Sequence, residues 1–246
     1  MKICAAQIKP IKGDVDTNIA IHKTVIASAV AKQVDVIFFP ELSITGYEPT
    51  LAKELATTQD DERFDEFQTM SDGSGITIGV GMPTKSNAGD LISMIIFQPH
   101  QPRQTYSKQL LHSDEVPYFI CGQQEVVLTI NQEKIAPAIC YESLQPEHAD
   151  RAADKGANIY IASVAKPDRG VAKALKHYPT IAKKHSMPVL MSNCLGPSDD
   201  FESVGQSAIW NQDGRLVGQL DDMTEGILVY DTSAGTVLAD YGCSES

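Results

Sequence analysis

Residues 134–147 of this 246-residue chain read KIAPAICYESLQPE. The apolar run at 135–139 predicts a short strand, Cys140 closes that strand, and Pro146 fits the first turn of a helix. A residue at such a junction projects from the edge of a sheet, and the unpaired N–H groups of the turn point at whatever bonds to it. This position suits a nucleophile. The alternative is that Cys140 is a small buried hydrophobic residue, because free cysteine is among the most buried residue types.

The first forty residues contain a complete β-α-β pattern. A compact apolar strand is expected at 3–8, a helix with apolar residues at helical spacing at 14–33, and a continuous apolar strand at 34–39. Two strands joined by a crossover helix form a parallel pair. The loop at 40–47 follows the second strand at its carboxyl end, where open α/β sheets place their ligands. Glu41 is therefore well placed to take part in a site.

The same alternation returns after Cys140, so both halves of the chain carry β-α-β units. This order predicts an α/β fold in which two sheets pack as a pseudo-symmetric sandwich with helices outside, in a single domain over residues 1–246. Further helices are expected at 59–70, 146–155 and 171–185, and further strands at 76–81, 91–97, 126–130, 158–162, 189–193, 205–210, 215–220 and 226–230.

Composition limits the function classes. The net charge of −12 and the sequence pI near 4.8 disfavour nucleic acid and anionic membranes as partners. Five cysteines without a repeating spacing argue against a disulfide scaffold or a zinc site, so we expect a reduced chain in the cytoplasm with no metal and no cofactor. No stretch approaches the ~20 apolar residues of a membrane span. A small-molecule enzyme fits these limits.

A lysine and a glutamate seven residues apart precede the Cys140 unit. Lys108 and Glu115 lie in the segment 106–122, which has no regular hydrophobic periodicity. Alone, a lysine in such a segment is an ordinary surface residue. Its position just upstream of a candidate nucleophile is what makes it a candidate for the site.

Glu41, Lys108 and Cys140 stand in the contexts PELxxTGY, YxKxxL and ICYE, and this combination resembles the nitrilase superfamily of carbon-nitrogen hydrolases, in its amidase-like branch. Several such motifs in order make a chance match improbable. The resemblance spans most of the chain and includes Pro146-Glu147 and the segments 192–196, 205–207 and 225–228.

The resemblance implies a fold, a catalytic set and an assembly. The fold is a four-layer α-β-β-α sandwich with two mixed sheets. The catalytic residues are Glu41, Lys108 and Cys140, joined by Glu115 as a second glutamate. We expect a homodimer or a larger homo-oligomer that acts on a small-molecule amide. Two departures fall near regions that shape substrate pockets: Leu144-Gln145 replaces an arginine and an aromatic residue, and the tryptophan often found near 165–167 is absent.

The residue types support this chemistry independently. A thiol with a pKa of about 8.5 needs a base to react at neutral pH, and Glu41 supplies one. The Lys108 ammonium and the Tyr141 backbone N–H would receive the tetrahedral oxyanion that forms when Cys140 attacks an amide. Glu115 would orient Lys108. No histidine is required for these steps.

The acyl pocket is expected to be formed by the loops that carry Tyr47, Glu115 and Tyr141 and by the segment after Ala162. Its substrate contacts are expected from Tyr47, Tyr141 and Glu142. The preferred substrate is a small linear amide or a carbamoyl compound. Three alternatives stay open: nitrile hydrolysis by the same triad, a non-catalytic member of the fold that binds a metabolite, and a thiol redox protein. The redox reading lacks a Cys-x-x-Cys motif and a resolving cysteine close in sequence.

Overall fold

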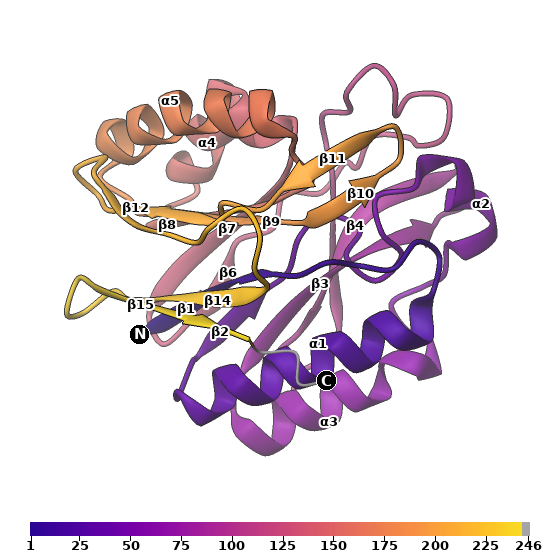
Figure 1. The fold of residues 1–246 in the computed structure, drawn as a ribbon, viewed down its shortest axis with the longest axis horizontal. Coiled ribbons are helices and arrows are strands. Elements are labelled where there is room, and N and C mark those ends of the chain that lie inside the picture. The colour runs from indigo at the N-terminus through magenta and orange to yellow at the C-terminus, as the bar shows by residue number, and fades with distance from the viewer. Residues whose placement is uncertain (243–246) are drawn as a thin grey trace.

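Two β-sheets packed face to face form the centre of the structure, a computed structural model that describes residues 1–242. One sheet has seven strands and the other has six. Helices α1 (Val15–Ala31) and α3 (Asp65–Ser74) cover the outside of the first sheet, and α4 (Pro146–Asp154) and α5 (Asp168–His185) cover the outside of the second (Figure 1). The four-layer α-β-β-α sandwich predicted from the sequence is confirmed.

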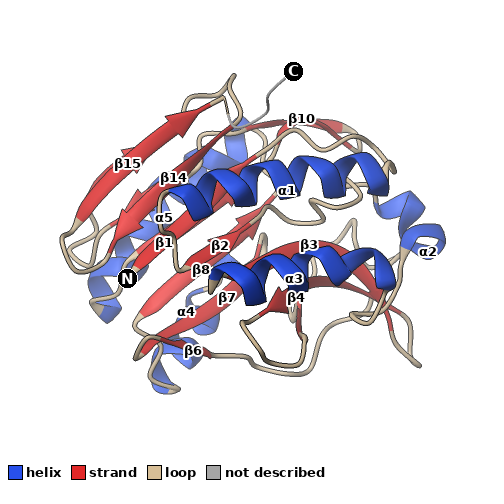
Figure 2. Ribbon diagram, turned by 90° about the horizontal axis from the view of Figure 1, so that it is seen from below, coloured by secondary structure: helices blue, strands red, loops and turns tan. Residues whose placement is uncertain are grey.

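The seven-stranded sheet has the order β15-β14-β1-β2-β3-β4-β5. Its central strands β1, β2 and β3 are parallel, and its other neighbouring pairs are antiparallel. Helices α1 and α3 run side by side across its outer face (Figure 2). Its strands are β1 (Lys2–Gln7), β2 (Val36–Phe38), β3 (Thr77–Lys85), β4 (Asp90–Phe97), β5 (Gln104–Ser107), β14 (Gly226–Asp231) and β15 (Thr236–Tyr241).

The six-stranded sheet has the order β13-β12-β9-β8-β7-β6, with β7, β8 and β9 parallel. A short hairpin of β10 (Leu195–Ser198) and β11 (Phe201–Val204) leaves this sheet, and the short helix α2 (Ala52–Leu55) lies at the end of the first one. The strands of the six-stranded sheet are β6 (Leu128–Ile130), β7 (Glu133–Ile139), β8 (Ile159–Val164), β9 (Val189–Asn193), β12 (Ala208–Trp210) and β13 (Leu216–Gln219).

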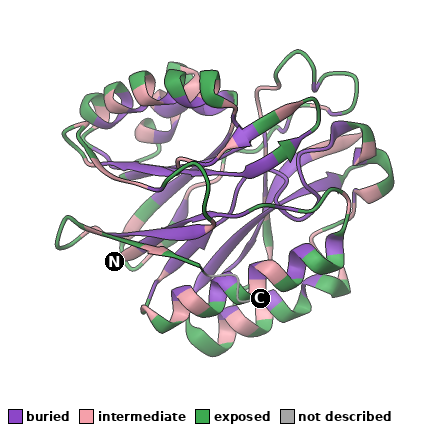
Figure 3. Ribbon diagram, viewed as in Figure 1, coloured by how far each residue is buried: buried purple, intermediate pink, exposed green. Residues whose placement is uncertain are grey.

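Apolar side chains fill three layers between these elements. Ile3, Phe38 and Leu190 belong to the layer between the two sheets. Phe67 belongs to the layer under α1 and α3, and Trp210 to the layer under α4 and α5. The central strands are buried on both faces while the helices expose one side (Figure 3), which explains why those strands read as continuous apolar runs. The edge strands β13 and β15 are half-buried or exposed. Within residues 1–242, no helix is long and apolar enough to cross a membrane.

Most expected elements are present, and the differences have local causes. The crossover between β1 and β2 is the predicted parallel unit. The helix expected at 59–70 instead begins at Asp65, after a 3-10 turn at Glu62–Phe64. The strand expected from 205 begins at Ala208, because Gly205 and Gln206 both have positive φ angles. Strands β5, β10, β11 and β15 were not expected.

Carboxyl ends of parallel strands from the two sheets meet at one edge of the sandwich. The Ser163 hydroxyl in β8 donates a 2.7 Å hydrogen bond to the carbonyl of Phe39, directly after β2. The loop after β2 carries Glu41, and the turn after β7 carries Cys140. The sheet packing therefore brings two of the expected catalytic residues into one region.

Gly81 in β3 holds the Glu41 loop close to the first sheet. Its carbonyl accepts a 2.9 Å hydrogen bond from the N–H of Ile44. A Cβ at this position would lie 2.4 Å from the nitrogen of Leu42 and 2.5 Å from the carbonyl oxygen of Pro40. Both are backbone atoms, so a larger residue would displace the whole loop.

We expect Gly81→Ala to lower the free energy of unfolding by about 1–3 kcal/mol, the usual effect of overpacking. Gly73→Ala in α3 is the matched control, because a Cβ there meets nothing within 4 Å. That change should stabilise the helix by about 0.5–1 kcal/mol. Urea denaturation of both variants measures the difference, and equal midpoints would refute the close approach at Gly81.

Candidate active site

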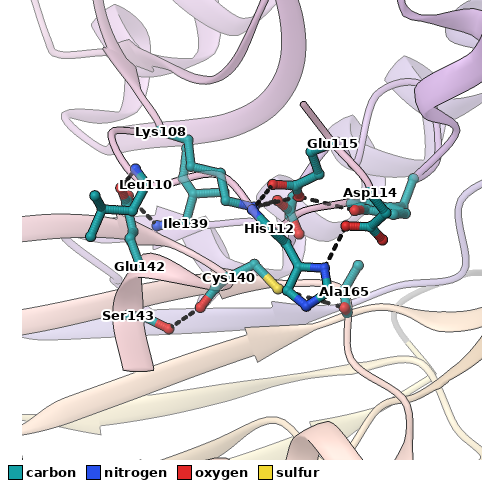
Figure 4. A network of polar contacts seen from close by, with 12 residues as sticks. Lys108, Leu110, His112, Asp114, Glu115, Ile139, Cys140, Glu142, Ser143 and Ala165 are labelled. Atoms are coloured by element: carbon teal, nitrogen blue, oxygen red, sulfur yellow. Dashed lines mark hydrogen bonds and ion pairs between the residues drawn. The ribbon is translucent and has the colours of Figure 1, made fainter. Parts of the chain in front are cut away.

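Lys108 lies between two glutamates. Its Nζ donates a 2.7 Å hydrogen bond to Oε1 of Glu41. It also donates a 2.5 Å hydrogen bond to Oε1 of Glu115 (Figure 4). The three side chains come from the loop after β2, the end of β5 and the irregular segment beyond it. None of the three side chains is more than 1% exposed. The structure therefore brings together three residues that lie 67 and 7 positions apart in sequence.

The carboxylates keep Lys108 charged although it is buried. Burial alone would lower the pKa of Lys108, but Glu41 and Glu115 outweigh burial and raise it. Burial raises the pKa of Glu41 to about 7, although the neighbouring Lys108 acts in the opposite direction. Glu41 can therefore both take up and release a proton near neutral pH.

Cys140 occupies a strained turn directly after β7. Its φ angle is 47°, in the left-handed region that residues other than glycine seldom adopt. The Cys140 N–H donates a 3.0 Å hydrogen bond to the carbonyl of Ser163, and the Ser143 hydroxyl donates to the Cys140 carbonyl. These bonds fix the turn, and a 3-10 turn at Glu142–Leu144 follows. The predicted strand-turn junction is confirmed.

The Cys140 thiol is neutral in the resting site. Burial, followed by the negative charge of Glu41, raises the pKa of the thiol to about 11, and Lys166 and Lys108 act in the opposite direction. A thiol of this kind reacts only if a base removes its proton. The Cys140 side chain also lowers the pKa of Glu41, so each of the two groups affects the ionisation of the other.

Glu115 is held from both sides. The Tyr47 hydroxyl donates a 2.9 Å hydrogen bond to its Oε1, and the backbone N–H of His112 donates a 2.7 Å hydrogen bond to its Oε2. These contacts, together with the ion pair, use both carboxylate oxygens. Glu115 is thus fixed within hydrogen-bond distance of Lys108.

A cavity of about 400 Å³ opens next to the thiol. Cys140 and Glu115 line it, as do Tyr47 and Tyr141, which were expected to contact substrate. Leu144-Gln145 and the segment 165–167 also line it. The two places where the sequence departs from its relatives therefore both border the cavity.

Glu142, also expected to contact substrate, lies away from the cavity lining. It is buried, and burial raises its pKa. Its Oε1 accepts hydrogen bonds from the Tyr106 hydroxyl at 2.6 Å and from the Ile139 N–H at 2.8 Å. Its Oε2 accepts from the N–H groups of Gln109, at 2.6 Å, and Leu110, at 3.3 Å. These bonds tie the Lys108 segment to the Cys140 turn.

Lys166 lies in the segment after Ala162 that was expected to help form the pocket, but sequence reasoning did not single it out as a site residue. Its Nζ lies 3.7 Å from the Sγ of Cys140, and it is only 4% exposed. The available signal was its position just past the carboxyl end of β8, the strand parallel to the one that carries the nucleophile. Residues 1–242 contain no group of three or more His, Cys, Asp or Glu side chains placed to hold a metal ion.

The pattern of the carbon-nitrogen hydrolase family matches residues 2–239, and the chain therefore belongs to this family. Its structural relatives are amidases of the nitrilase superfamily, as the sequence motifs indicated. An amidase is also among its curated relatives.

Two curated relatives illustrate the range of the similarity. The chain is 24% identical over 245 residues to the glutamine-dependent NAD(+) synthetase of Aquifex aeolicus, covering 96% of this chain and 43% of the synthetase. It is 25% identical over 197 residues to the 2-oxoglutaramate amidase of Bacillus subtilis, covering 77% of this chain and 74% of the amidase. The chain thus spans less than half the length of the synthetase.

Solved structures share the fold. An amidase from Nesterenkonia sp. matches with a TM-score of 0.86 at 22% identity, covering 98% of this chain and 90% of that one. A double mutant of the Nesterenkonia sp. AN1 amidase in complex with acrylamide matches with a TM-score of 0.86 at 21% identity, covering 98% and 91%. At this level of identity the likeness establishes the fold alone.

We expect Glu142→Gln to lower the free energy of unfolding by about 1–3 kcal/mol, because an amide NH₂ would face backbone N–H donors and leave them unpaired. Glu202→Gln, on an exposed position of β11, is the matched control and should change stability by less than about 0.5 kcal/mol. Thermal unfolding followed by circular dichroism compares the two. If Glu142→Gln unfolds like the wild type, the carboxylate does not hold the two segments together.

Proposed function

We propose that the protein hydrolyses the carbon–nitrogen bond of a small linear amide through a thioester on Cys140. One observation carries the proposal: a buried lysine held between two glutamates lies beside a cysteine in a left-handed turn, at the wall of a cavity. The pairing of a neutral thiol with a base whose pKa is about 7 supports nucleophilic catalysis.

In the acylation half, Glu41 takes the proton of the Cys140 thiol as the sulfur attacks the amide carbonyl carbon. The carbonyl oxygen becomes an oxyanion. Its proposed donors are the Lys108 ammonium and the N–H of Tyr141, which lies at the start of a helical turn where N–H groups lack intrahelical partners. The carbon–nitrogen bond then breaks, and Glu41 gives its proton to the leaving nitrogen. Ammonia leaves and the thioester remains.

In the deacylation half, Glu41 removes a proton from a water molecule that attacks the thioester carbon. A second oxyanion forms at the same donors. It collapses with cleavage of the carbon–sulfur bond, and the proton on Glu41 returns to the sulfur. The carboxylic acid product departs and the thiol is restored.

The size of the cavity and the relatives support a small substrate. Ligand sites commonly enclose about 300–1,000 Å³, and about 400 Å³ is near the lower end of that range. Two relatives have names or complexes that involve small amides, a 2-oxoglutaramate amidase and an amidase bound to acrylamide. Tyr47 and Tyr141, which line the cavity, are the proposed substrate contacts.

Ammonia release from a panel of compounds tests the proposal. The panel holds short aliphatic amides, ω-amides of dicarboxylic acids, N-carbamoyl amines and the matching nitriles. We expect at least one amide to exceed every nitrile in kcat/KM. A nitrile that exceeds every amide would replace the proposal by nitrile hydrolysis, and a silent panel would favour a non-catalytic, metabolite-binding member of the fold.

Substitutions in the triad test the assigned roles. We expect Cys140→Ser to lose nearly all activity, because a hydroxyl is far less acidic than a thiol. Glu41→Gln keeps an acceptor for Lys108 but loses proton transfer, which should lower kcat by about 10²–10⁴-fold. Cys121→Ser changes an exposed cysteine and serves as the control. Intact-mass spectrometry measures the rate at which Glu41→Gln forms the acyl-enzyme. If that rate equals the wild-type rate, Glu41 acts only in deacylation.

We also propose a homodimer in the cytoplasm. Val116 and Tyr118 are exposed apolar side chains two residues apart, and a second copy that packs on this segment would bury both. Static light scattering at micromolar concentration should give twice the 26.7 kDa mass of the chain. A single species at the monomer mass would remove the dimer.

A further inference from the structure

Three basic side chains form one wall of the cavity. Lys166 follows β8, and Arg169 and Lys173 lie in the first turns of α5, where all three line the cavity beside Cys140. Among residues 1–242, no carboxylate oxygen lies within 4.0 Å of the charged nitrogens of these three residues. We call Lys166, Arg169 and Lys173 the basic wall.

Lys166 is built into this wall and is not a mobile surface side chain. Its N–H donates a 2.8 Å hydrogen bond to Oδ1 of Asn193, and Nδ2 of Asn193 donates back to its carbonyl at 3.1 Å. Gly170 packs against it so closely that a Cβ there would lie 3.1 Å from the Cβ of Lys166. The backbone and the start of the side chain are therefore fixed, and the ammonium points at the thiol.

The surroundings of Lys166 lack an anion. In the part of the chain that the structure describes, the Sγ of Cys140 at 3.7 Å is the acceptor found for its Nζ. A buried ammonium without a carboxylate is unfavourable unless a ligand supplies the missing charge. Lys108 differs sharply, because two carboxylates already hold it. Lys166 is thus the buried cation that is free to bind a substrate.

The charge of the remaining groups leaves room for an anionic ligand. Glu41, Glu115 and Lys108 together carry one negative charge when all are ionised, and Lys166 balances it. Two aspartates, Asp114 and Asp200, also line the cavity, and Asp114 contacts His112. Without Lys166, a negatively charged substrate would meet a negative site.

We propose that the acyl part of the substrate carries a carboxylate close to the reacting amide, and that Lys166 binds this carboxylate while Arg169 and Lys173 attract it into the cavity. The inference rests on the proposed function for the reaction. Because Nζ of Lys166 is only 3.7 Å from the sulfur, the carboxylate belongs a few bonds from the reacting carbonyl carbon. The monoamides of succinic and glutaric acid have this form.

A pair of thiol reagents tests the anion site without any turnover. Iodoacetate and iodoacetamide both form a carbon–sulfur bond as iodide leaves, and they differ in that only iodoacetate carries a carboxylate. The ratio of their rate constants at one cysteine cancels the fraction of thiolate. A role of Lys166 limited to stabilising the thiolate would change both rates equally and leave the ratio unaltered. The exposed Cys121 in the same chain serves as an internal reference.

We expect the ratio of iodoacetate to iodoacetamide rates at Cys140 to exceed that at Cys121 by about tenfold, the effect of a hydrogen bond to a charged group. Lys166→Met keeps the stem of the side chain and should reduce the ratio to that of Cys121 or below. Lys176→Met removes the same charge from an exposed position of α5 outside the cavity lining, and should leave the ratio unchanged. Peptide mass spectrometry gives both rates.

The second part of the experiment compares the turnover of charged and neutral amides. We expect kcat/KM of the wild type to be higher for the monoamides of succinic and glutaric acid than for butyramide and valeramide, and Lys166→Met to lower this preference about tenfold. Equal reagent ratios at Cys140 and Cys121 in the wild type, with neutral amides preferred, would overturn the anion site and leave amide hydrolysis standing. If Cys140 prefers iodoacetate but no amide is turned over, the anion site stands and amide hydrolysis is overturned.

Discussion

The buried ion cluster of Lys108 with Glu41 and Glu115 is the constraint on which the rest of the site depends. An ammonium in the interior of a protein is stable only if its charge is matched and its donors are satisfied. Two carboxylates from separate segments do this here. Each partner must therefore be held within hydrogen-bond distance by its own backbone. The close packing at Gly81 and the hydrogen bonds to Glu115 have this role.

The two-sheet architecture makes such a cluster possible. Each sheet has a parallel core, so each presents strand carboxyl ends and their loops at one edge. Packing the sheets face to face brings Glu41 from one and Cys140 from the other to the same edge, with the Ser163 to Phe39 hydrogen bond crossing between the sheets. Glu142 then links the Lys108 segment to the Cys140 turn. Fold and site are therefore stabilised by the same contacts.

Much of this arrangement could be predicted from sequence, because its signals are local. Apolar runs that end at Glu41 and Cys140 mark strand ends, and the order of the motifs indicates the family and its sandwich. The contacts of Glu142 could not be predicted, since they depend on backbone groups 32 and 33 residues away. For the same reason Lys166 was not singled out. Its position after a strand end is a local signal, but its short distance to a thiol 26 residues earlier is visible only in the structure.

Two lysines lie close to the same reactive centre, and their surroundings separate their roles. Lys108 is enclosed by carboxylates, so its charge is already balanced. Its remaining hydrogen-bonding capacity suits an oxyanion that exists only briefly during the reaction. Lys166 has no such carboxylate within reach in residues 1–242, and it lines the cavity. In the mechanism that we propose, the balanced cation serves the reaction and the unbalanced cation selects among substrates. A single sandwich can in this way keep its reaction while changing its substrate through residues at the end of one strand.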